Sequence, residues 1–338
     1  MASRVSAASQ FAVYGPTFLD VVMGPLDGPP VPGREAWVEG ALMCAGGAAN
    51  QAIALARLGA PVRLHSRVGV DQMGQFVDEM LAREGVDTSL CERVGDQNVT
   101  VSLSFGGDRA MTTRGTTALP RLGGDAPACL LADVRGISAN SEVVSSWRER
   151  GTWVLADTAW DEAGAWDPAD LEALRVADVC TPNEEEALAY ARTDSVEDAA
   201  RWFASFGCDC VVTCGKNGVI ACVDGQILRV PAPAVSAVDT TGAGDVFSAA
   251  LAWALRARRM PWPEALALAC AAAAHSTQGI GGASPAPPPA RPPRAGGAPP
   301  GPPPARPGGG PPPPPASRYK TGQTGSAPVS FRLLRRFH

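Results

Sequence analysis

Short apolar runs alternate with amphipathic stretches along the first 283 residues. Apolar runs bounded by turn residues predict strands at residues 11–14, 62–68, 153–156, 211–213 and 219–223. Apolar positions at helical spacing predict helices at residues 49–58, 73–84, 184–191, 244–256 and 263–274. Strands that alternate with helices indicate an α/β fold, in which a largely parallel sheet is covered by helices on both faces.

Two segments do not fit this alternation. Residues 99–105 and 110–113 are both strand-like, and the turn sequence Gly106-Gly107-Asp108 separates them, which predicts a hairpin. Residues 35–43 are also strand-like but belong to no βα unit. These segments predict a small β element that projects from the main sheet.

The composition changes abruptly after residue 283. Residues 285–315 contain 17 prolines and 6 glycines, and they offer almost nothing apolar to bury. We therefore predict a folded domain over residues 1–283 and a disordered or polyproline-like tail over residues 284–338. A tail without a function of its own is favoured over a proline-rich docking segment.

The charge distribution excludes some partners. The tail carries eight basic side chains and no acidic one, so residues 1–283 have 21 basic and 34 acidic side chains, a net charge of −13. A domain this acidic is a poor nucleic-acid ligand. No apolar run is long enough to cross a membrane, and the N-terminus lacks a signal core. We expect a cytoplasmic protein that binds neither nucleic acid nor membrane.

The nine cysteines have no disulfide spacing, which indicates a reducing compartment. Four of them cluster, but not as CxxC pairs, and we interpret them as buried apolar residues rather than metal ligands: Cys208, Cys210, Cys214 and Cys222. The absence of a G-x-x-x-x-G-K-[ST] run excludes a P-loop kinase.

The segment Asp239-Thr-Thr-Gly-Ala-Gly-Asp245 carries the most specific chemistry. Small residues end a loop where a helix begins, so the amides of Gly242, Ala243 and Gly244 can face a phosphate. Asp245 lies in the first helical turn, where a carboxylate can accept the proton of an attacking hydroxyl. By itself the segment also fits an ordinary capped helix.

Three further segments are individually ambiguous. Gly46-Gly47 with Asn50 suits close approach to a polyhydroxylated ligand, or simply a glycine-rich helix start. Asn183 can cap a helix whose first turn holds Glu186, and the same carboxylate could order Mg²⁺ or phosphate. The run Thr213-Cys-Gly-Lys-Asn-Gly218 predicts a tight turn between two strands.

Together and in this order, the segments resemble the ribokinase-like (PfkB-type) carbohydrate kinase family. Gly46-Gly47-x-x-Asn50 is similar to its N-terminal signature, and residues 239–245 to its C-terminal one. The resemblance implies a three-layer α/β core with a mostly parallel central sheet and a small β lid, here residues 32–44 and 97–118. It further implies a homodimer formed through the lid.

The resemblance also implies roles for individual residues. Asp245 would be the catalytic base and Gly242, Ala243 and Gly244 the anion hole, and the sugar would bind Asp20, Gly46, Gly47 and Asn50. The nucleotide side would comprise Asn183, Glu186, Thr213, Gly215 and Gly218. Glu186 would hold Mg²⁺ through water, and Asp239 and Thr241 would hold a monovalent cation such as K⁺.

The implied activity is ATP-dependent phosphorylation of a ribose- or fructose-like sugar. Two alternatives stay open. A nucleoside kinase uses the same scaffold. A catalytically impaired sugar- or nucleotide-binding protein would follow from the C-terminal departure, because proline-rich sequence replaces the family's closing segment and final helix after residue 283. Asp157 and Asp161 follow a predicted strand of the parallel sheet, at the end where ligands bind, and we favour capping or turn roles for both over contact with substrate or Mg²⁺.

Overall fold

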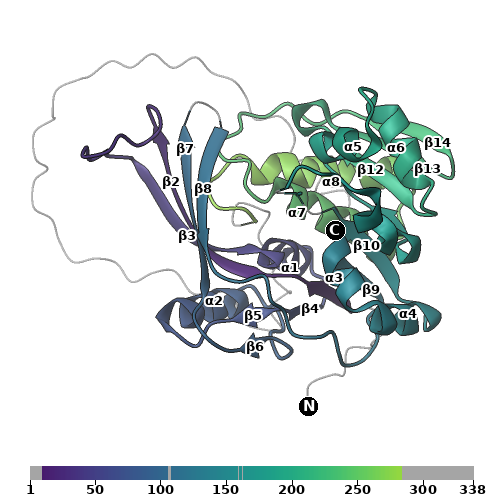
Figure 1. The fold of residues 1–338 in the computed structure, drawn as a ribbon, viewed down its shortest axis with the longest axis horizontal. Helices are drawn as coiled ribbons and strands as arrows, with labels where there is room; N and C mark the ends of the chain where they lie inside the picture. Colours follow the sequence, from purple (N-terminus) through teal and green to yellow (C-terminus); the bar gives the residue numbers. More distant parts are fainter. Residues whose placement is uncertain (1–9, 106–107, 159, 162, 284–338) are drawn as a thin grey trace, which may run out of the picture. The chain divides into compact units, whose positions relative to one another are not determined.

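The main sheet has eight strands, in the order β14-β13-β12-β11-β10-β9-β1-β4 (Figure 1). The computed structural model describes residues 10–105, 108–158, 160–161 and 163–283. Six strands are mutually parallel, and β13 and β14 are antiparallel at one edge. The strands are β1 (Phe11–Tyr14), β4 (Val62–His65), β9 (Cys129–Asp133), β10 (Trp153–Asp157), β11 (Val179–Cys180), β12 (Asp209–Thr213), β13 (Val219–Val223) and β14 (Gln226–Val230).

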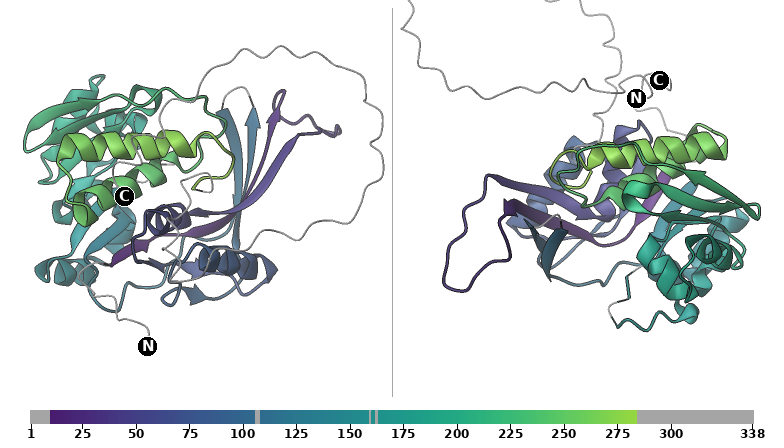
Figure 2. Two further views of the ribbon diagram at one scale, coloured as in Figure 1. Left: turned by 180° about the vertical axis from the view of Figure 1, so that it is seen from behind. Right: turned by 90° about the horizontal axis from the view of Figure 1, so that it is seen from above.

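Helices cover both faces of this sheet (Figure 2). One buried cluster joins alternate strand residues to α3, α4, η2, α5 and α6, while α1, α7 and α8 pack together on the other face. The bounds are α1 (Ala48–Arg57), α2 (Gln72–Arg83), α3 (Val134–Ala139), α4 (Ser141–Glu149), η2 (Pro168–Val176), α5 (Glu184–Ala191), α6 (Val196–Ala204), α7 (Ala243–Ala252) and α8 (Trp262–Ser276), with a short η3 (Gly215–Asn217) and a π-helical η4 (Trp253–Ala257). Burial on both faces explains why the central strands β1, β9 and β10 are almost continuously apolar.

A four-stranded sheet in the order β3-β2-β7-β8 forms the projecting element, here called the lid. Its strands are β2 (Thr17–Leu26), β3 (Gly40–Gly47), β7 (Asn98–Phe105) and β8 (Asp108–Arg114), and β5 (Arg67–Val68) pairs with β6 (Glu92–Arg93) nearby. The hairpin of β7 and β8 confirms the predicted antiparallel pair. Gly106 and Gly107 lie outside the described residues.

The lid differs from its predicted bounds in two ways. It includes β2, a strand after Gly15-Pro16 that the sequence pattern did not predict, and residues 35–39 are not in a strand. The chain changes sheets at Gly15, where a Cβ atom would lie 2.9 Å from the Cβ of Ala48. Glycine there allows the start of α1 to pack directly on the turn.

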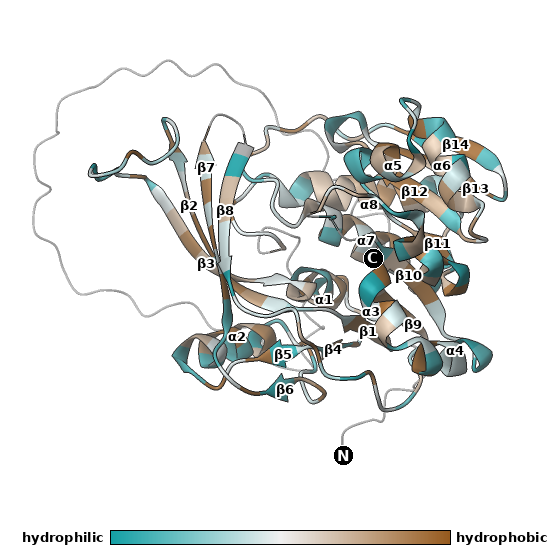
Figure 3. Ribbon diagram, in the orientation of Figure 1, coloured by the Kyte–Doolittle hydropathy of each residue, from teal (hydrophilic) through white to brown (hydrophobic). Residues whose placement is uncertain are grey.

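Several core elements are absent from the sequence prediction. They are β9, α3, α4, β11, α6 and β14. In Figure 3 the strands of the main sheet are largely hydrophobic, whereas exposed turns and helix surfaces are hydrophilic. The nine cysteines are buried and unpaired, which confirms that Cys208, Cys210, Cys214 and Cys222 are buried residues. Within the described residues, no helix is long and apolar enough to span a bilayer.

Candidate active site

The loop in which the sequence predicts an anion site lies at the start of α7, where the Ala243 amide donates to the Thr240 carbonyl oxygen at 3.3 Å. Gly242 is its N-cap with φ of 69°, and no side chain caps this helix end. A Cβ atom at Gly242 would lie 2.9 Å from the Asn50 side-chain nitrogen, so glycine is needed both for conformation and for space. Helix N-terminal amides without a side-chain cap favour an anion at this point.

Asp245, in the first turn of α7, is held by two amides from α1. Asn50 Nδ2 donates to one carboxylate oxygen at 3.1 Å, and Gln51 Nε2 donates to the other at 3.3 Å. Burial raises the pKa of Asp245 to about 6, the two amide hydrogen bonds oppose this rise, and the charge of Asp20 adds to it. A carboxylate with a fixed orientation and a pKa near neutrality suits a general base.

The sugar-binding residues implied by the resemblance gather where the lid joins the core. Asp20 on β2 is 7% exposed, and burial with the charge of Asp239 raises its pKa to about 6. A Cβ atom at Gly46 would lie 1.8 Å from Asp20 Oδ2, and Gly47 has φ of 63°. The glycines thus leave room for the Asp20 carboxylate beside Asn50.

Asp239 closes the loop that precedes the anion site. One carboxylate oxygen accepts from the Thr241 amide and the other from the Gly281 amide, both at 2.9 Å. The Thr241 hydroxyl oxygen is buried and has no hydrogen-bond partner among the described residues. An oxygen of this kind in a closed loop fits coordination of a monovalent cation.

Side chains from the carboxyl ends of three parallel strands line a cavity of about 220 Å³ next to Asp245. Its lining residues are Arg109, Asp157, Thr158, Thr181, Asn183, Glu186, Thr213, Thr240, Gly242, Ala243, Gly244, Asp245 and Ser248. The cavity therefore brings the predicted base, anion loop and three of the five nucleotide-side residues together, at the sheet edge where α/β folds bind ligands.

Glu186 is fixed by its neighbours at this cavity. It forms a capping box with Asn183 at the start of α5, and the Thr158 hydroxyl donates to its carboxylate at 2.5 Å. Burial raises the pKa values of Glu186 and, more strongly, of Asp157, where the charges of Glu186 and Asp245 add to the effect. Buried carboxylates that repel one another are suited to hold a divalent cation.

Gly215 and Gly218 do not line this cavity. Gly215 begins η3 with φ of 53°. Gly218 has φ of 91°, and a Cβ atom there would lie 2.1 Å from the Val230 carbonyl oxygen. Gly218 therefore allows β14 to approach the turn between β12 and β13.

Comparison with known proteins agrees with this geometry. The profile of the pfkB family of carbohydrate kinases matches residues 39–119 and 137–289. The chain belongs to this family. The ribokinase-like expectation from the sequence is confirmed, and so is the enzyme class.

Individual relatives of this pfkB-family kinase include sugar and nucleoside kinases. A fructokinase of Klebsiella pneumoniae is 36% identical over 271 residues, covering 70% of this chain and 88% of the relative. An aminoimidazole riboside kinase of Salmonella typhimurium is 28% identical over 279 residues, covering 73% of this chain and 86% of the relative. The structure of Arabidopsis thaliana ribokinase complexed with ribose and ATP aligns with a TM-score of 0.70 at 25% identity, over 82% of this chain and 96% of that one.

The kinase site contains residues that sequence reasoning missed or misread. Asp157, for which the sequence favours a capping or turn role over contact with substrate or Mg²⁺, lines the cavity at the carboxyl end of β10. Asp161 does form a turn, because its carboxylate accepts from the Trp166 amide at 2.7 Å. Gln51 and Arg109 were not singled out, because neither belongs to a recognisable motif.

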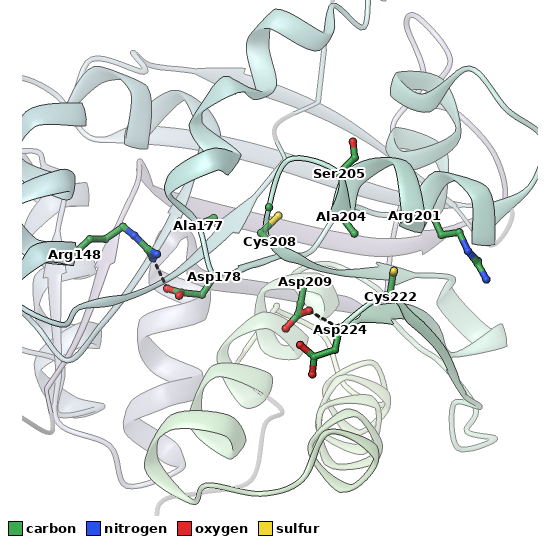
Figure 4. Close-up of a pocket in the computed structure, with 12 residues that line it drawn as sticks. Arg148, Ala177, Asp178, Arg201, Ala204, Ser205, Cys208, Asp209, Cys222 and Asp224 are labelled. Atoms are coloured by element: carbon green, nitrogen blue, oxygen red, sulfur yellow. Dashed lines mark hydrogen bonds and ion pairs between the residues drawn. The ribbon is translucent and has the colours of Figure 1, made fainter.

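A larger cavity, of about 640 Å³, lies at the opposite, amino ends of β11 and β12 (Figure 4). Three of its charged side chains have local partners. Arg148 pairs with Asp178 at 2.5 Å, and Asp209 accepts from the Asp224 amide at 3.0 Å. It shares no lining residue with the site around Asp245.

Proposed function

We propose that this kinase transfers the γ-phosphoryl group of ATP to a hydroxyl of a fructose- or ribose-like sugar. One observation carries the proposal: Asp245 contacts Asn50 on the sugar side and lines the same cavity as the anion loop and Asn183. A single carboxylate thus stands between the two substrates, as a base for phosphoryl transfer must.

In the proposed reaction, Asp245 removes the proton of the sugar hydroxyl. The sugar oxygen forms a bond to the γ-phosphorus as the bond to ADP breaks, and the amides of residues 242–244 stabilise the charge on the phosphoryl oxygens. Asp20, Asn50 and the backbone of Gly46 and Gly47 orient the sugar. The donors and acceptors of Asp20 and Asn50 match a polyhydroxylated ligand.

Asn183 and Thr213 border the nucleotide side, with Gly215 and Gly218 shaping the adjacent turn. Glu186 would hold Mg²⁺ through water, and Asp157, which lines the same cavity, would assist. The ion would neutralise phosphate charge and orient the triphosphate. The loop of Asp239 and Thr241 would hold K⁺, which would stiffen the segment that precedes the anion loop.

A nucleoside substrate is the second candidate. The aminoimidazole riboside kinase among the relatives favours it, because that protein's name describes a ribose bearing a base. The pocket around Asp20 would bind the ribose in the same way, so the two candidates differ in the group attached to the sugar.

The test is an assay coupled to ADP release with fructose, ribose and a set of nucleosides. We expect the wild-type protein to turn over one class, and Asp245→Asn to lower kcat about 10²- to 10⁴-fold, the usual contribution of general acid–base catalysis. If wild type and Asp245→Asn were equally silent on every substrate, the protein would be an impaired binding protein. Equal activity of the two would refute Asp245 as the base.

A further inference from the structure

The charges around the 220 Å³ cavity are strongly unbalanced. Three carboxylates line it, those of Asp157, Glu186 and Asp245, and among its described lining residues there is one cationic side chain, that of Arg109. A nucleoside triphosphate brings further negative charge into the same space. The Mg²⁺ proposed at Glu186 and the roughly half positive charge of a helix N-terminus offset only part of it.

Arg109 comes from the lid, not from the core. It lies on β8, and its Nη1 atom donates to the Thr240 hydroxyl oxygen at 2.9 Å. Thr240 immediately precedes the anion loop and lines the same cavity. This contact fixes a guanidinium beside the amides of residues 242–244, although the two chain segments are 131 residues apart.

The chemistry of this side chain fits a phosphoryl group. Guanidinium is planar, permanently charged and able to donate two parallel hydrogen bonds to phosphate oxygens. Fastening a lid strand to a threonine hydroxyl would not by itself require a charge. The position next to the anion loop, rather than next to Asp20 and Gly46, favours the phosphate over the sugar as the contact.

We propose that Arg109 is a catalytic residue that binds the transferring phosphoryl group from the lid side. This rests on the proposed kinase function. Arg109 neither gains nor loses a proton: the sugar proton goes to Asp245, the sugar oxygen bonds to phosphorus, and ADP leaves. Arg109 stabilises the charge on the non-bridging oxygens together with the loop amides.

The test compares Arg109→Ala and Arg109→Lys with Arg114→Ala. Arg114 is on the same strand, but it pairs with Asp96 on the exposed surface, so its removal is a matched control. We expect Arg109→Ala to lower kcat about 10²- to 10³-fold, the range for losing one charge-stabilising donor, with little change in KM for the sugar. Arg109→Lys retains part of the activity, and Arg114→Ala keeps it all.

Chemical rescue separates catalysis from a structural role. Added guanidinium ion at millimolar concentration should restore part of the activity of Arg109→Ala, and the unfolding temperature of the variant should match that of wild type. Activity equal to that of Arg114→Ala would overturn the proposal. So would a loss confined to the KM of the sugar, or a loss without rescue and with a lowered unfolding temperature.

A binding measurement does not depend on turnover. ADP with aluminium fluoride resembles a phosphoryl group in transfer, and Arg109→Ala should bind this complex at least about tenfold more weakly while binding ADP alone normally. Equal affinity of wild type and variant for the complex would contradict the proposal. Wild-type protein silent on every sugar and nucleoside would instead refute the kinase function.

Discussion

At the scale of single residues, the account depends on how Asp245 is held. Its two oxygens accept from Asn50 and Gln51, and burial raises its pKa to about 6. The signature Gly46-Gly47-x-x-Asn50 made Asn50 predictable from the sequence. Gln51, one position further on, was not predictable, because only the packing of α1 against α7 brings it to the carboxylate.

The pKa gives a pH dependence with a defined sign. A base works in its ionised form, so kcat/KM should be constant well above pH 6 and fall as the pH decreases through about 6. Gln51 hydrogen-bonds the ionised form, so its removal favours the protonated form. We therefore expect Gln51→Leu to move the acid limb of the profile to higher pH.

The shift of the pH profile in Gln51→Leu would assign the acid limb of the profile to Asp245. Asp20 also has a pKa of about 6, so the wild-type profile alone does not distinguish the two carboxylates. Gln51 contacts Asp245, and the pKa of Asp20 should respond little to its removal. A profile of Gln51→Leu that overlays that of wild type would contradict the assignment.

At the scale of elements, the sequence pattern predicted the helices and hairpins whose structural signals lie within their own residues. Residues 184–191 form α5 as predicted, because Asn183 and Glu186 encode its capping box. The sequence Gly106-Gly107-Asp108 likewise predicted that β7 and β8 pair as a hairpin. By contrast, the sheet that a strand joins depends on distant contacts. The sequence pattern did not predict β2, because its pairing with β3 and β7 is set by tertiary packing.

The lid leaves an apolar row on one face. Met43, Val21 and Val101 are neighbours across three strands, and Met43 and Val101 are 49% and 36% exposed. Alternation along the strands places this row on the face opposite Asp20. We propose that a second copy of the chain covers it, forming a homodimer through the lid.

The homodimer can be tested by substitution. We expect Met43→Glu with Val101→Glu to convert a dimer into a monomer in analytical ultracentrifugation, because burying two carboxylates opposes association. Val70→Glu is the control, since Val70 is 61% exposed and lies between β5 and α2, in none of the lid strands. A wild-type monomer, or a doubly substituted protein that stays dimeric, would rule out this interface.

At the scale of the whole molecule, residues 280–283 connect three parts of the site. The Gly281 amide donates to Asp239, and the Ala283 amide donates to Asn50 at 3.1 Å. A Cβ atom at Gly40 of the lid would lie 3.0 Å from the Ile280 side chain. The lid, the loop of Asp239 and α1 therefore meet at this short segment. From the sequence, residues 280–283 were predicted only to end the folded domain.

This segment, not the proline-rich sequence after it, should determine activity. We expect a chain shortened to residues 1–291 to keep the kcat and unfolding temperature of the full chain, since the family match ends at residue 289. A chain ending at Gln278 loses the amides that hold Asp239 and Asn50. Its kcat should fall at least about tenfold, because a small misplacement of catalytic groups is costly.

These two truncations also separate the open alternatives for the C-terminal region. Loss of activity in the chain of residues 1–291 would assign a function to the tail. Full activity of the chain ending at Gln278 would show that the contacts of Gly281 and Ala283 do not organise the site.

The central claim is that Asp245 activates a sugar hydroxyl toward the γ-phosphate of ATP. Phosphorus NMR of ATP mixed with the enzyme and fructose or ribose tests it most directly. The account predicts a new sugar phosphomonoester signal that grows in step with ADP, and that grows at least about 100-fold more slowly with Asp245→Asn. Inorganic phosphate formed without any sugar phosphate, or an undiminished signal with Asp245→Asn, would contradict it.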